Sequence, residues 1–214
     1  MPVGPPNAGR TTTVHARCAL AIWLIALSSG MAMMTHSSLT AGAVGASPER
    51  WPVASIIPRP ETNAMIVVSV HPACPCTSAT MAELSEWVQS RQNPPEVVVL
   101  AALPDGEATR WDLRRLAEQT GTIAGARLIV DPAGVESLRH GAKTSGHLAY
   151  YDAAGVLRFR GGVTASRGHR GPSAGLSALS ALTDNQPSEA PSAPVFGCPL
   201  HDPECTVGSV EPPR

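Results

Sequence analysis

The sequence predicts an α/β fold in which a central mixed sheet is the middle layer of a three-layer sandwich. Residues 64–183 alternate between short, continuously apolar segments and longer amphipathic ones, the pattern of buried strands joined by helices. Near the end of this region, two strand-like segments are separated only by turn residues, which adds an antiparallel hairpin to otherwise parallel strands. Together these observations predict one compact domain with a mixed sheet.

The first elements form a strand–helix–strand unit. Residues 64–70 (AMIVVSV) and 96–103 (EVVVLAAL) are apolar and rich in β-branched side chains, so both are expected to be strands buried on both faces. Between them, residues 77–91 carry apolar side chains at three- and four-residue spacing, which predicts an amphipathic helix.

The second half continues the alternation. Asp105 is expected to cap a second helix, with Leu116 and Thr120 on one side. The remaining expected elements are a third strand at 126–130 that ends at Asp131-Pro132, hairpin strands at 148–151 and 156–159, and a closing helix that contains Leu176, Leu179 and Leu182.

Residues 1–50 predict an export segment followed by a linker. Residues 18–35 contain no charged side chain, and Arg10 and Arg17 precede them, so the N-terminus is expected in the cytoplasm and the remainder outside it. Residues 35–48 have the small and polar composition of a tether. We therefore expect a location on the periplasmic side of the inner membrane. The chain is either anchored there or released after signal cleavage, and both alternatives stay open.

Composition separates a folded domain from a C-terminal tail and excludes one class of partner. Residues 51–183 are expected to form the folded domain, and the proline-rich residues 184–214 a largely disordered tail without periodicity. The formal net charge is −1 and only 15% of residues are charged, so the basic surplus that nucleic-acid binding needs is missing. The expected partners are therefore the membrane, through the N-terminal segment, and a small or protein substrate.

The strongest chemical signal is the segment HPACPCT, residues 71–77, between the first strand and the first helix. With Pro75 at the first helical position, Cys74 falls at or beside the N-cap, where free backbone N–H groups and the helix dipole favour an anion. A thiol there is stabilised as the thiolate, which is the nucleophile or metal ligand. Cys74 is therefore predicted to be the reactive residue.

This arrangement resembles the thioredoxin-like superfamily, in particular its exported, membrane-tethered members. The resemblance covers residues 60–183: strand, cysteine turn, helix, strand, helix, hairpin and closing helix. The family turn is Cys-x-x-Cys, whereas the same register here reads Cys74-Pro75-Cys76-Thr77. The segments TSGH, YDxxG and GGxTxSRGH are also similar to a little-characterised branch called RedB-like. The resemblance implies a thiol–disulfide oxidoreductase, or a peroxiredoxin-like enzyme, that acts on thiol and disulfide proteins or on a peroxide.

The shifted second cysteine leaves three expectations for the thiol that resolves Cys74. Cys76 is the favoured partner and would close a small, strained Cys-x-Cys disulfide; in the two alternatives Cys198 would fold back from the tail, or an external thiol would react. Thioredoxin-like proteins usually place a cis-proline opposite the reactive cysteine, but the equivalent stretch, residues 144–147, contains no proline. Its Ser145 or Thr144 is expected to hydrogen-bond a thiolate or a peroxide instead.

Histidines complete the predicted site. His71 and His147 are candidates to lower the thiol pKa as imidazolium ions, to act as general acid or base, or to ligate a metal. The competing interpretation is that each only hydrogen-bonds the backbone, and this is the expected role of His169. The expected catalytic set is Cys74, Cys76, Thr77, His71, Ser145 and His147.

Two other functions remain open beside the oxidoreductase, for which no cofactor is expected. Thiolate and imidazole suit Cu(I), so Cys74, Cys76 and His147 would bind copper in a metallochaperone similar to the Sco type, although that family spaces its cysteines as Cys-x-x-x-Cys. The third function is a non-catalytic docking module whose cysteines form only structural disulfides. A local bond between Cys198 and Cys205 would be one of them.

Overall fold

The computed structural model describes residues 8–103, 112–184, 186 and 192–201, and the chain divides into two units at residues 40 and 41. The first unit contains one helix, α1 (Ala8–Leu39). Its segment His15–Leu39 is long and apolar enough to cross a membrane, judged by length and composition. A cleavable signal sequence near an N-terminus has the same properties, so the anchored and the released forms are both compatible with α1.

The second unit is built on a five-stranded mixed sheet in the order β3-β2-β1-β4-β5. Its strands are β1 (Met65–Val70), β2 (Glu96–Leu103), β3 (Arg127–Pro132), β4 (His147–Tyr151) and β5 (Leu157–Gly161). The first three are parallel, whereas β4 runs antiparallel to β1 and to β5. The expected α/β fold with a central mixed sheet and a closing hairpin is confirmed.

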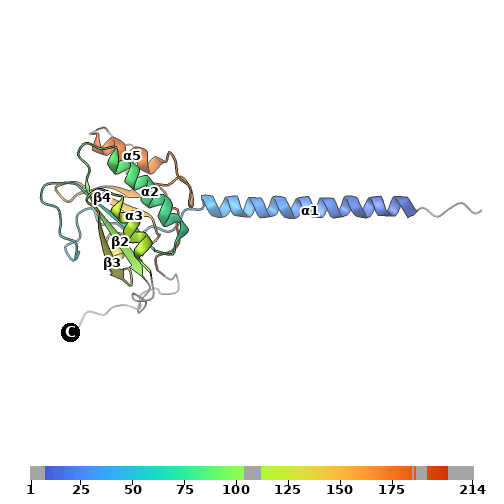
Figure 1. Cartoon of the computed structure of the whole chain (residues 1–214), viewed down its shortest axis with the longest axis horizontal. Coiled ribbons are helices and arrows are strands. Elements are labelled where there is room, and N and C mark those ends of the chain that lie inside the picture. The colour runs from blue at the N-terminus through green and yellow to red at the C-terminus, as the bar shows by residue number, and fades with distance from the viewer. Residues whose placement is uncertain (1–7, 104–111, 185, 187–191, 202–214) are drawn as a thin grey trace, which may run out of the picture. The chain divides into compact units, whose positions relative to one another are not determined.

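Three helices cover one face of this sheet: α2 (Pro75–Gln89), α3 (Arg114–Gly121) and α5 (Ala174–Thr183) (Figure 1). Leu84 of α2 and Leu179 of α5 are fully buried against Val68 and Phe159 of the sheet. Trp87 Nε1 of α2 donates a hydrogen bond to Ser180 Oγ of α5 at 3.0 Å, so the two helices also contact each other. This face holds the larger hydrophobic core.

The opposite face is covered mainly by irregular chain and a short helix. Ile57 packs on Met65, Val67 and Leu100. Beside this segment lies α4 (Val135–Arg139), which the sequence did not predict, because five residues are too few to show helical periodicity. The Asp131 carboxylate accepts hydrogen bonds from the first backbone N–H groups of α4, and this cap comes from the end of β3.

Several expected boundaries need correction. Residues 35–39 belong to α1 rather than to a tether, and the linker after residue 40 is attached to the domain. Gly42 N donates to Val195 O at 2.8 Å, and Gly45 N donates to Gly141 O at 2.9 Å. The strand expected to end before Asp131-Pro132 includes both residues. Asp105 lies outside the described residues, and the N-cap of α3 is Leu113.

Part of the expected disordered tail is ordered. Residues 192–200, which we call the C-terminal strap, lie against the domain without regular secondary structure, and Val195 within it is 0% exposed. Ala193 N donates to Arg160 O at 3.1 Å, and Gly162 N donates to Pro194 O at 3.2 Å. Main-chain bonds of this kind leave no periodic pattern in a single segment, which explains why composition alone suggested disorder.

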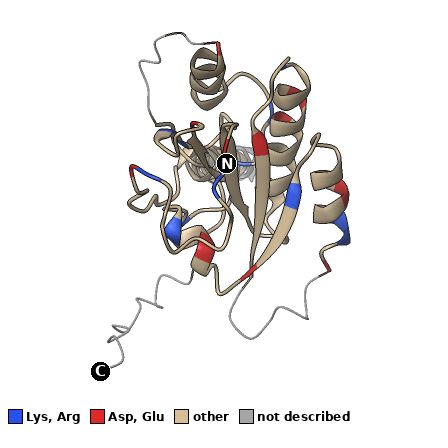
Figure 2. Ribbon diagram, turned by 90° about the vertical axis from the view of Figure 1, so that its left-hand side faces the viewer, with Lys and Arg blue, Asp and Glu red and all other residues tan. Residues whose placement is uncertain are grey.

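Charged side chains are interspersed rather than gathered by sign over the described part of the domain (Figure 2). One ion-pair group matters for the site. Arg170 Nε lies 3.2 Å from Glu83 Oε1, and its guanidinium also contacts Glu86. Gly171 N donates to the same Glu83 oxygen at 2.9 Å, so the loop that carries Arg170 is held on α2.

Candidate active site

The cysteine turn lies at the end of β1, where the chain enters α2. Cys74 is the N-cap of α2, with φ −77° and ψ 121°, and proline occupies the first turn, as predicted. Cys74 N donates to His71 O, and Thr77 N donates to Cys74 O, both at 3.0 Å. These two bonds close the turn, and the N–H of Cys76 in the first turn of the helix donates to the Cys74 sulfur.

The register between β1 and β4 brings Ser145 beside this turn. Ser69 of β1 pairs with His147 of β4, and Gly146 N donates to Ser69 O at 2.8 Å. Because the strands are antiparallel, residues just before β4 lie next to residues just after β1. Gly146 has φ +91°, and a Cβ there would lie 2.9 Å from Thr80 Oγ1, so glycine lets this loop approach α2.

Ser145 organises the hydroxyl groups of the site. Its Oγ accepts a hydrogen bond from His71 N at 3.0 Å and lies 3.2 Å from Thr77 Oγ1. The Thr77 hydroxyl donates to His71 O at 2.8 Å. Since that bond uses the only hydrogen of Thr77, the Ser145 hydroxyl hydrogen remains for Thr77 Oγ1 or for the Cys74 sulfur.

The third cysteine of the site comes from the C-terminal strap. Cys198 N donates to Cys74 Sγ at 3.4 Å, and Ser145 N donates to Cys198 O at 2.8 Å. Cys74 is 3% exposed and Cys76 is 5% exposed, whereas Cys198 is partly exposed. All three are free thiols. Because Cys76 and Cys198 both contact Cys74, the structure brings Cys74 together with both of its expected intramolecular partners.

The three thiols differ in acidity. Burial by itself would raise the pKa of Cys74, but the thiol and N–H of Cys198, the N–H of Cys76 and the Ser145 hydroxyl outweigh it, so its pKa is lowered. Burial and then the neighbouring Cys74 charge raise the pKa of Cys76. Burial and a hydrogen bond to Cys74 raise the pKa of Cys198 to about 11. Cys74 is therefore the most acidic of the three thiols, and it loses its proton before either neighbour.

Arg167 and Gly168 are site residues that the sequence analysis did not single out. The Arg167 guanidinium donates to Gly197 O, and its charge acts to lower the pKa of both Cys76 and Cys198. The N–H of Gly168 acts on Cys76 in the same direction. The SRGH segment that contains them was noticed only as a resemblance, because no local signal shows that this loop packs on the N-terminus of α2.

His71 contributes through its main chain rather than as an imidazolium. Its Nδ1 accepts a hydrogen bond from Ala73 N at 3.2 Å, and burial lowers the pKa of the ring. A ring that accepts at Nδ1 is neutral, so the expectation of a charged His71 beside Cys74 is corrected. The N–H and C=O of His71 instead hold Ser145 and Thr77.

His147 does not join the cysteines. Leu148 and Tyr150 face the helices, so strand alternation directs His147 to the opposite face, where it is 1% exposed. Burial, followed by the charges of Arg160 and His140, lowers its pKa to about 4. The copper site expected from Cys74, Cys76 and His147 is therefore not assembled. Among the described residues, no group of three His, Cys, Asp or Glu side chains is arranged to hold a metal.

Two further expectations concern the ends of the site. His169 Nδ1 lies 2.8 Å from Arg167 O, which is the backbone role expected for it. Cys205 lies outside the described residues, and so does the disulfide expected between it and Cys198.

The strand order, the hairpin and the position of Cys74 at the start of α2 match the fold class expected from the sequence. The fold is thioredoxin-like. It differs from the familiar pattern in the turn, which has cysteines at its first and third positions, and in the loop opposite, where Ser145 replaces a cis-proline; the described chain contains no cis peptide bond.

Comparisons with known proteins agree with the fold and say little of the activity. No family model and no curated protein matches the chain. It is similar to an uncharacterized conserved protein from Geobacillus kaustophilus, with a TM-score of 0.56, 19% identity, and coverage of 75% of this chain and 92% of that one. It is also similar to a hypothetical protein from Sinorhizobium meliloti 1021, with a TM-score of 0.54, 18% identity, and coverage of 76% of this chain and 94% of that one. At these identities the likeness shows the fold alone.

A third solved structure is the pneumococcal exposed lipoprotein thioredoxin from Streptococcus pneumoniae strain TIGR4. Its TM-score is 0.40 at 14% identity, with coverage of 58% of this chain and 86% of that one. A score below 0.5 does not bear on the function of this chain, which therefore has to be inferred from its own residues.

Removing the Ser145 hydroxyl is expected to raise the pKa of Cys74. Ser145→Ala deletes a group that stabilises the thiolate, so the pH at which the alkylation rate of Cys74 reaches half of its maximum should move upward. Thr77→Val is the comparison, because it deletes a neighbouring hydroxyl while Ser145 stays in place. The pH dependence of iodoacetamide labelling, read by peptide mass, checks this. Equal midpoints in Ser145→Ala and the unaltered protein would remove Ser145 from the site.

Proposed function

We propose that this chain is an exported thiol–disulfide oxidoreductase in which Cys74 is the nucleophile. The observation that carries the proposal is the Cys74 sulfur at the N-cap of α2, with the N–H of Cys198 3.4 Å away. Donors from the helix, the strap and the Ser145 hydroxyl stabilise the thiolate without a metal or a charged histidine. A buried thiolate held by neutral donors is suited to thiol exchange.

The reaction transfers two electrons between thiols and a disulfide. The Cys74 thiolate attacks one sulfur of a substrate disulfide, forms a mixed disulfide and releases the second substrate sulfur as a thiolate. A second thiol of the chain then loses its proton and attacks the Cys74 sulfur. The first substrate sulfur leaves and takes up a proton, so the substrate is reduced and the chain is oxidised. The reverse sequence oxidises a substrate dithiol.

The substrate class is a thiol or disulfide protein outside the cytoplasm. Support for the location comes from α1, whose apolar segment suits a signal anchor, and from Arg10 and Arg17, which precede the uncharged residues 18–35. A peroxide would use the same thiolate differently: Cys74 would become a sulfenic acid, and a second thiol would condense with it and release water. Rates with a disulfide and with hydrogen peroxide therefore separate the two substrate classes.

The pH dependence of alkylation tests this proposal directly. In the reduced full-length chain, kept soluble in detergent, Cys74 should react with iodoacetamide with a midpoint below pH 9.0, the ordinary value, whereas the midpoint of Cys198 should lie near pH 11. Below its midpoint, the Cys74 rate should fall about tenfold per pH unit, because only the thiolate reacts.

A docking module with purely structural cysteines would behave otherwise. Its Cys74 would show no preferential labelling at neutral pH and no two-electron exchange with a glutathione redox buffer. The proposal would be contradicted by a Cys74 alkylation midpoint at a higher pH than in the denatured protein. It would also be contradicted by a Cys74 disulfide that persists across the whole range of redox potentials.

A further inference from the structure

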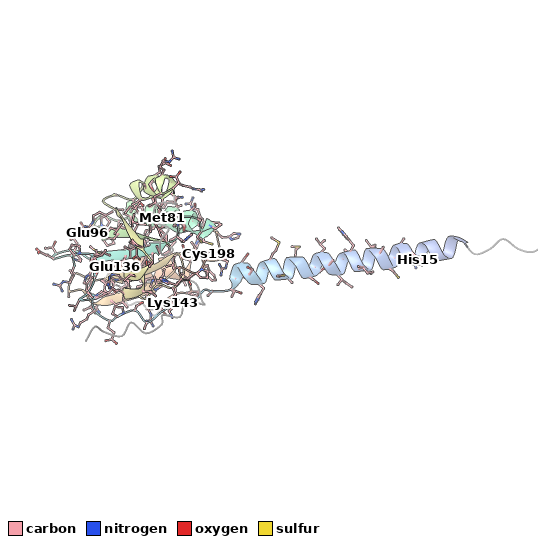
Figure 3. The ribbon with its side chains drawn as sticks, turned by 90° about the horizontal axis from the view of Figure 1, so that it is seen from below. His15, Met81, Glu96, Glu136, Lys143 and Cys198 are labelled. Atoms are coloured by element: carbon pink, nitrogen blue, oxygen red, sulfur yellow. The ribbon has the colours of Figure 1, made fainter. Side chains whose placement is uncertain are left out.

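The C-terminal strap is hydrogen-bonded to the domain at both of its ends. It begins beside β5, where Ser192 bridges Arg160, and it ends beside the loop before β4, where Pro199 bridges Thr144. Leu200 N donates to Lys143 O at 2.9 Å, and Ser145 N donates to Cys198 O at 2.8 Å. Cys198 and Lys143, which mark the two paired segments, are labelled in Figure 3.

The position of the strap depends on a close approach between Gly197 and the Ser145 loop. A Cβ on Gly197 would overlap Ser145 O, so only glycine allows the strap to lie this close to the Ser145 loop. Arg167 donates to the carbonyl of the same Gly197 from the other side. Leu200 beyond it is buried with Ala102 and Ala142. The strap is therefore anchored on both sides of Cys198.

This position of the strap places Cys198 in contact with Cys74 and also closes access to it. With the strap in place the Cys74 side chain is only 3% exposed, so a folded or extended protein disulfide does not reach its sulfur. The strap pairs with residues 143–145 through main-chain hydrogen bonds, which any extended polypeptide can form. The strap thus occupies the position that an incoming chain with a cysteine would need.

We propose that Cys198 is the thiol that resolves Cys74, and that the strap lifts to admit the substrate and reseats to deliver Cys198. This inference rests on the proposed function and names the second thiol that the function requires. In the first step the Cys74 thiolate attacks the substrate disulfide while the strap is lifted, a mixed disulfide forms, and the second substrate sulfur leaves as a thiolate. In the second step Cys198 loses its proton and attacks Cys74 Sγ. The Cys74–Cys198 disulfide forms, the bond from Cys74 to the first substrate sulfur breaks, and that sulfur takes up a proton and leaves as a thiol.

The chemistry of Cys198 supports this order. Burial comes first among the causes that raise its pKa, but the next two are a hydrogen bond and a charge from Cys74. Both of these disappear once Cys74 is held in a mixed disulfide, whereas the favourable charge of Arg167 remains. Cys198 is therefore protonated while Cys74 is free, and it becomes easier to ionise once Cys74 has reacted.

Cys76 is less suitable as the resolving thiol. Its thiol contacts Cys74 across the N-cap of α2, but only one residue separates the two cysteines, so a disulfide between them would close a small, strained ring. A bond between them would distort the turn that stabilises the thiolate. Cys198 belongs to a separate segment, so the same bond would leave α2 unchanged.

Disulfide mapping tests the inference in the reduced full-length chain after exposure to oxidised glutathione. The expected product is a Cys74–Cys198 bond, and Cys198→Ser should instead accumulate glutathione on Cys74. A predominant Cys74–Cys76 bond or a Cys198–Cys205 bond would overturn the inference, as would persistent glutathionylation of the unaltered chain. In each of these cases a reactive Cys74 would leave the proposed function intact, whereas an unreactive Cys74 would remove the function itself.

Gly197→Ala tests the strap without altering a cysteine. At a pH of about 9.5, where a thiol of ordinary pKa is largely ionised, a bulky maleimide should label Cys74 about tenfold faster, because the strap no longer packs against the Ser145 loop. Formation of the Cys74–Cys198 bond from the glutathione adduct should become slower. Gly121→Ala is the matched control, since nothing lies within 4 Å of a Cβ there, and it should change neither rate. Unchanged rates in Gly197→Ala would overturn the gating role.

Discussion

Replacing Cys74 with serine is expected to abolish thiol–disulfide exchange, with a loss of at least about 10³-fold in turnover. The serine hydroxyl is neither ionised nor a good nucleophile toward sulfur at neutral pH, and the hydrogen bonds around position 74 do not change that. The measurement is the rate at which the chain reduces a disulfide-linked fluorescent peptide, with dithiothreitol as the electron source and the uncatalysed rate subtracted.

Cys76→Ser provides the matched comparison for this loss, because it removes a buried thiol from the same turn. It should retain most of the turnover, since Cys76 keeps its proton and Cys198 remains beside Cys74. If Cys74→Ser kept the activity of the unaltered chain, the nucleophile would have been misassigned. If Cys76→Ser instead lost as much activity as Cys74→Ser, the two cysteines would act as one unit.

Asp131→Ala is expected to give the largest loss of stability, about 2–4 kcal/mol in the free energy of unfolding. The Asp131 carboxylate is 2% exposed and accepts from Glu136 N at 2.9 Å and from Ser137 N at 2.8 Å. Alanine would leave two buried N–H groups without an acceptor. A five-residue helix has little stability of its own, so α4 depends on this cap.

The loss should spread to the polar network that α4 supports on the second face. The Glu136 carboxylate contacts Ser55, pairs with Arg139 Nη1 at 2.7 Å and lies 3.3 Å from His140 Nε2. The other nitrogen of the His140 ring, Nδ1, lies 3.2 Å from the Tyr151 hydroxyl. Urea denaturation followed by fluorescence gives the free energy, because Trp51 packs edge-on against His140 and Tyr151.

Asp112→Ala is the control for Asp131→Ala. Asp112 also accepts a backbone N–H, that of Arg114 at 3.0 Å, but its side chain is exposed to solvent. Its replacement should change the free energy of unfolding by no more than about 0.5 kcal/mol. Similar small losses in both variants would mean that α4 is held by its packing rather than by the Asp131 cap.

The elements that could be predicted are those with strong local patterns. β1 and β2 appear within one residue of the expected strands, because continuous β-branched runs are buried on both faces of a parallel sheet. Cys74 was placed at the N-cap from Pro75 alone, since proline is favoured in the first turn of a helix. Helix α4 and the C-terminal strap were missed, because one is too short for periodicity and the other has no regular secondary structure.

The site was predicted in part for the same reason. Cys74, Cys76, Thr77 and Ser145 meet as expected, because a strand–turn–helix unit and an antiparallel hairpin fix which loops adjoin. His147 was misplaced because one position along a strand changes the face on which a side chain lies. Arg167 and Gly168 carried no local signal, since their effect depends on a loop that Glu83 holds against α2.

By itself, the sequence determined the order of the strands and of the longer helices of the domain, an apolar N-terminal segment and a cysteine at a helix N-terminus, because periodicity, proline and charge act over a few neighbouring residues. Only the tertiary structure placed Cys198 against Cys74. The hydrogen bond from Cys198 N to Cys74 Sγ joins residues 124 positions apart, through main-chain pairing between the strap and residues 143–145. Such pairing uses groups that every residue carries, so it leaves no residue pattern from which it could be read.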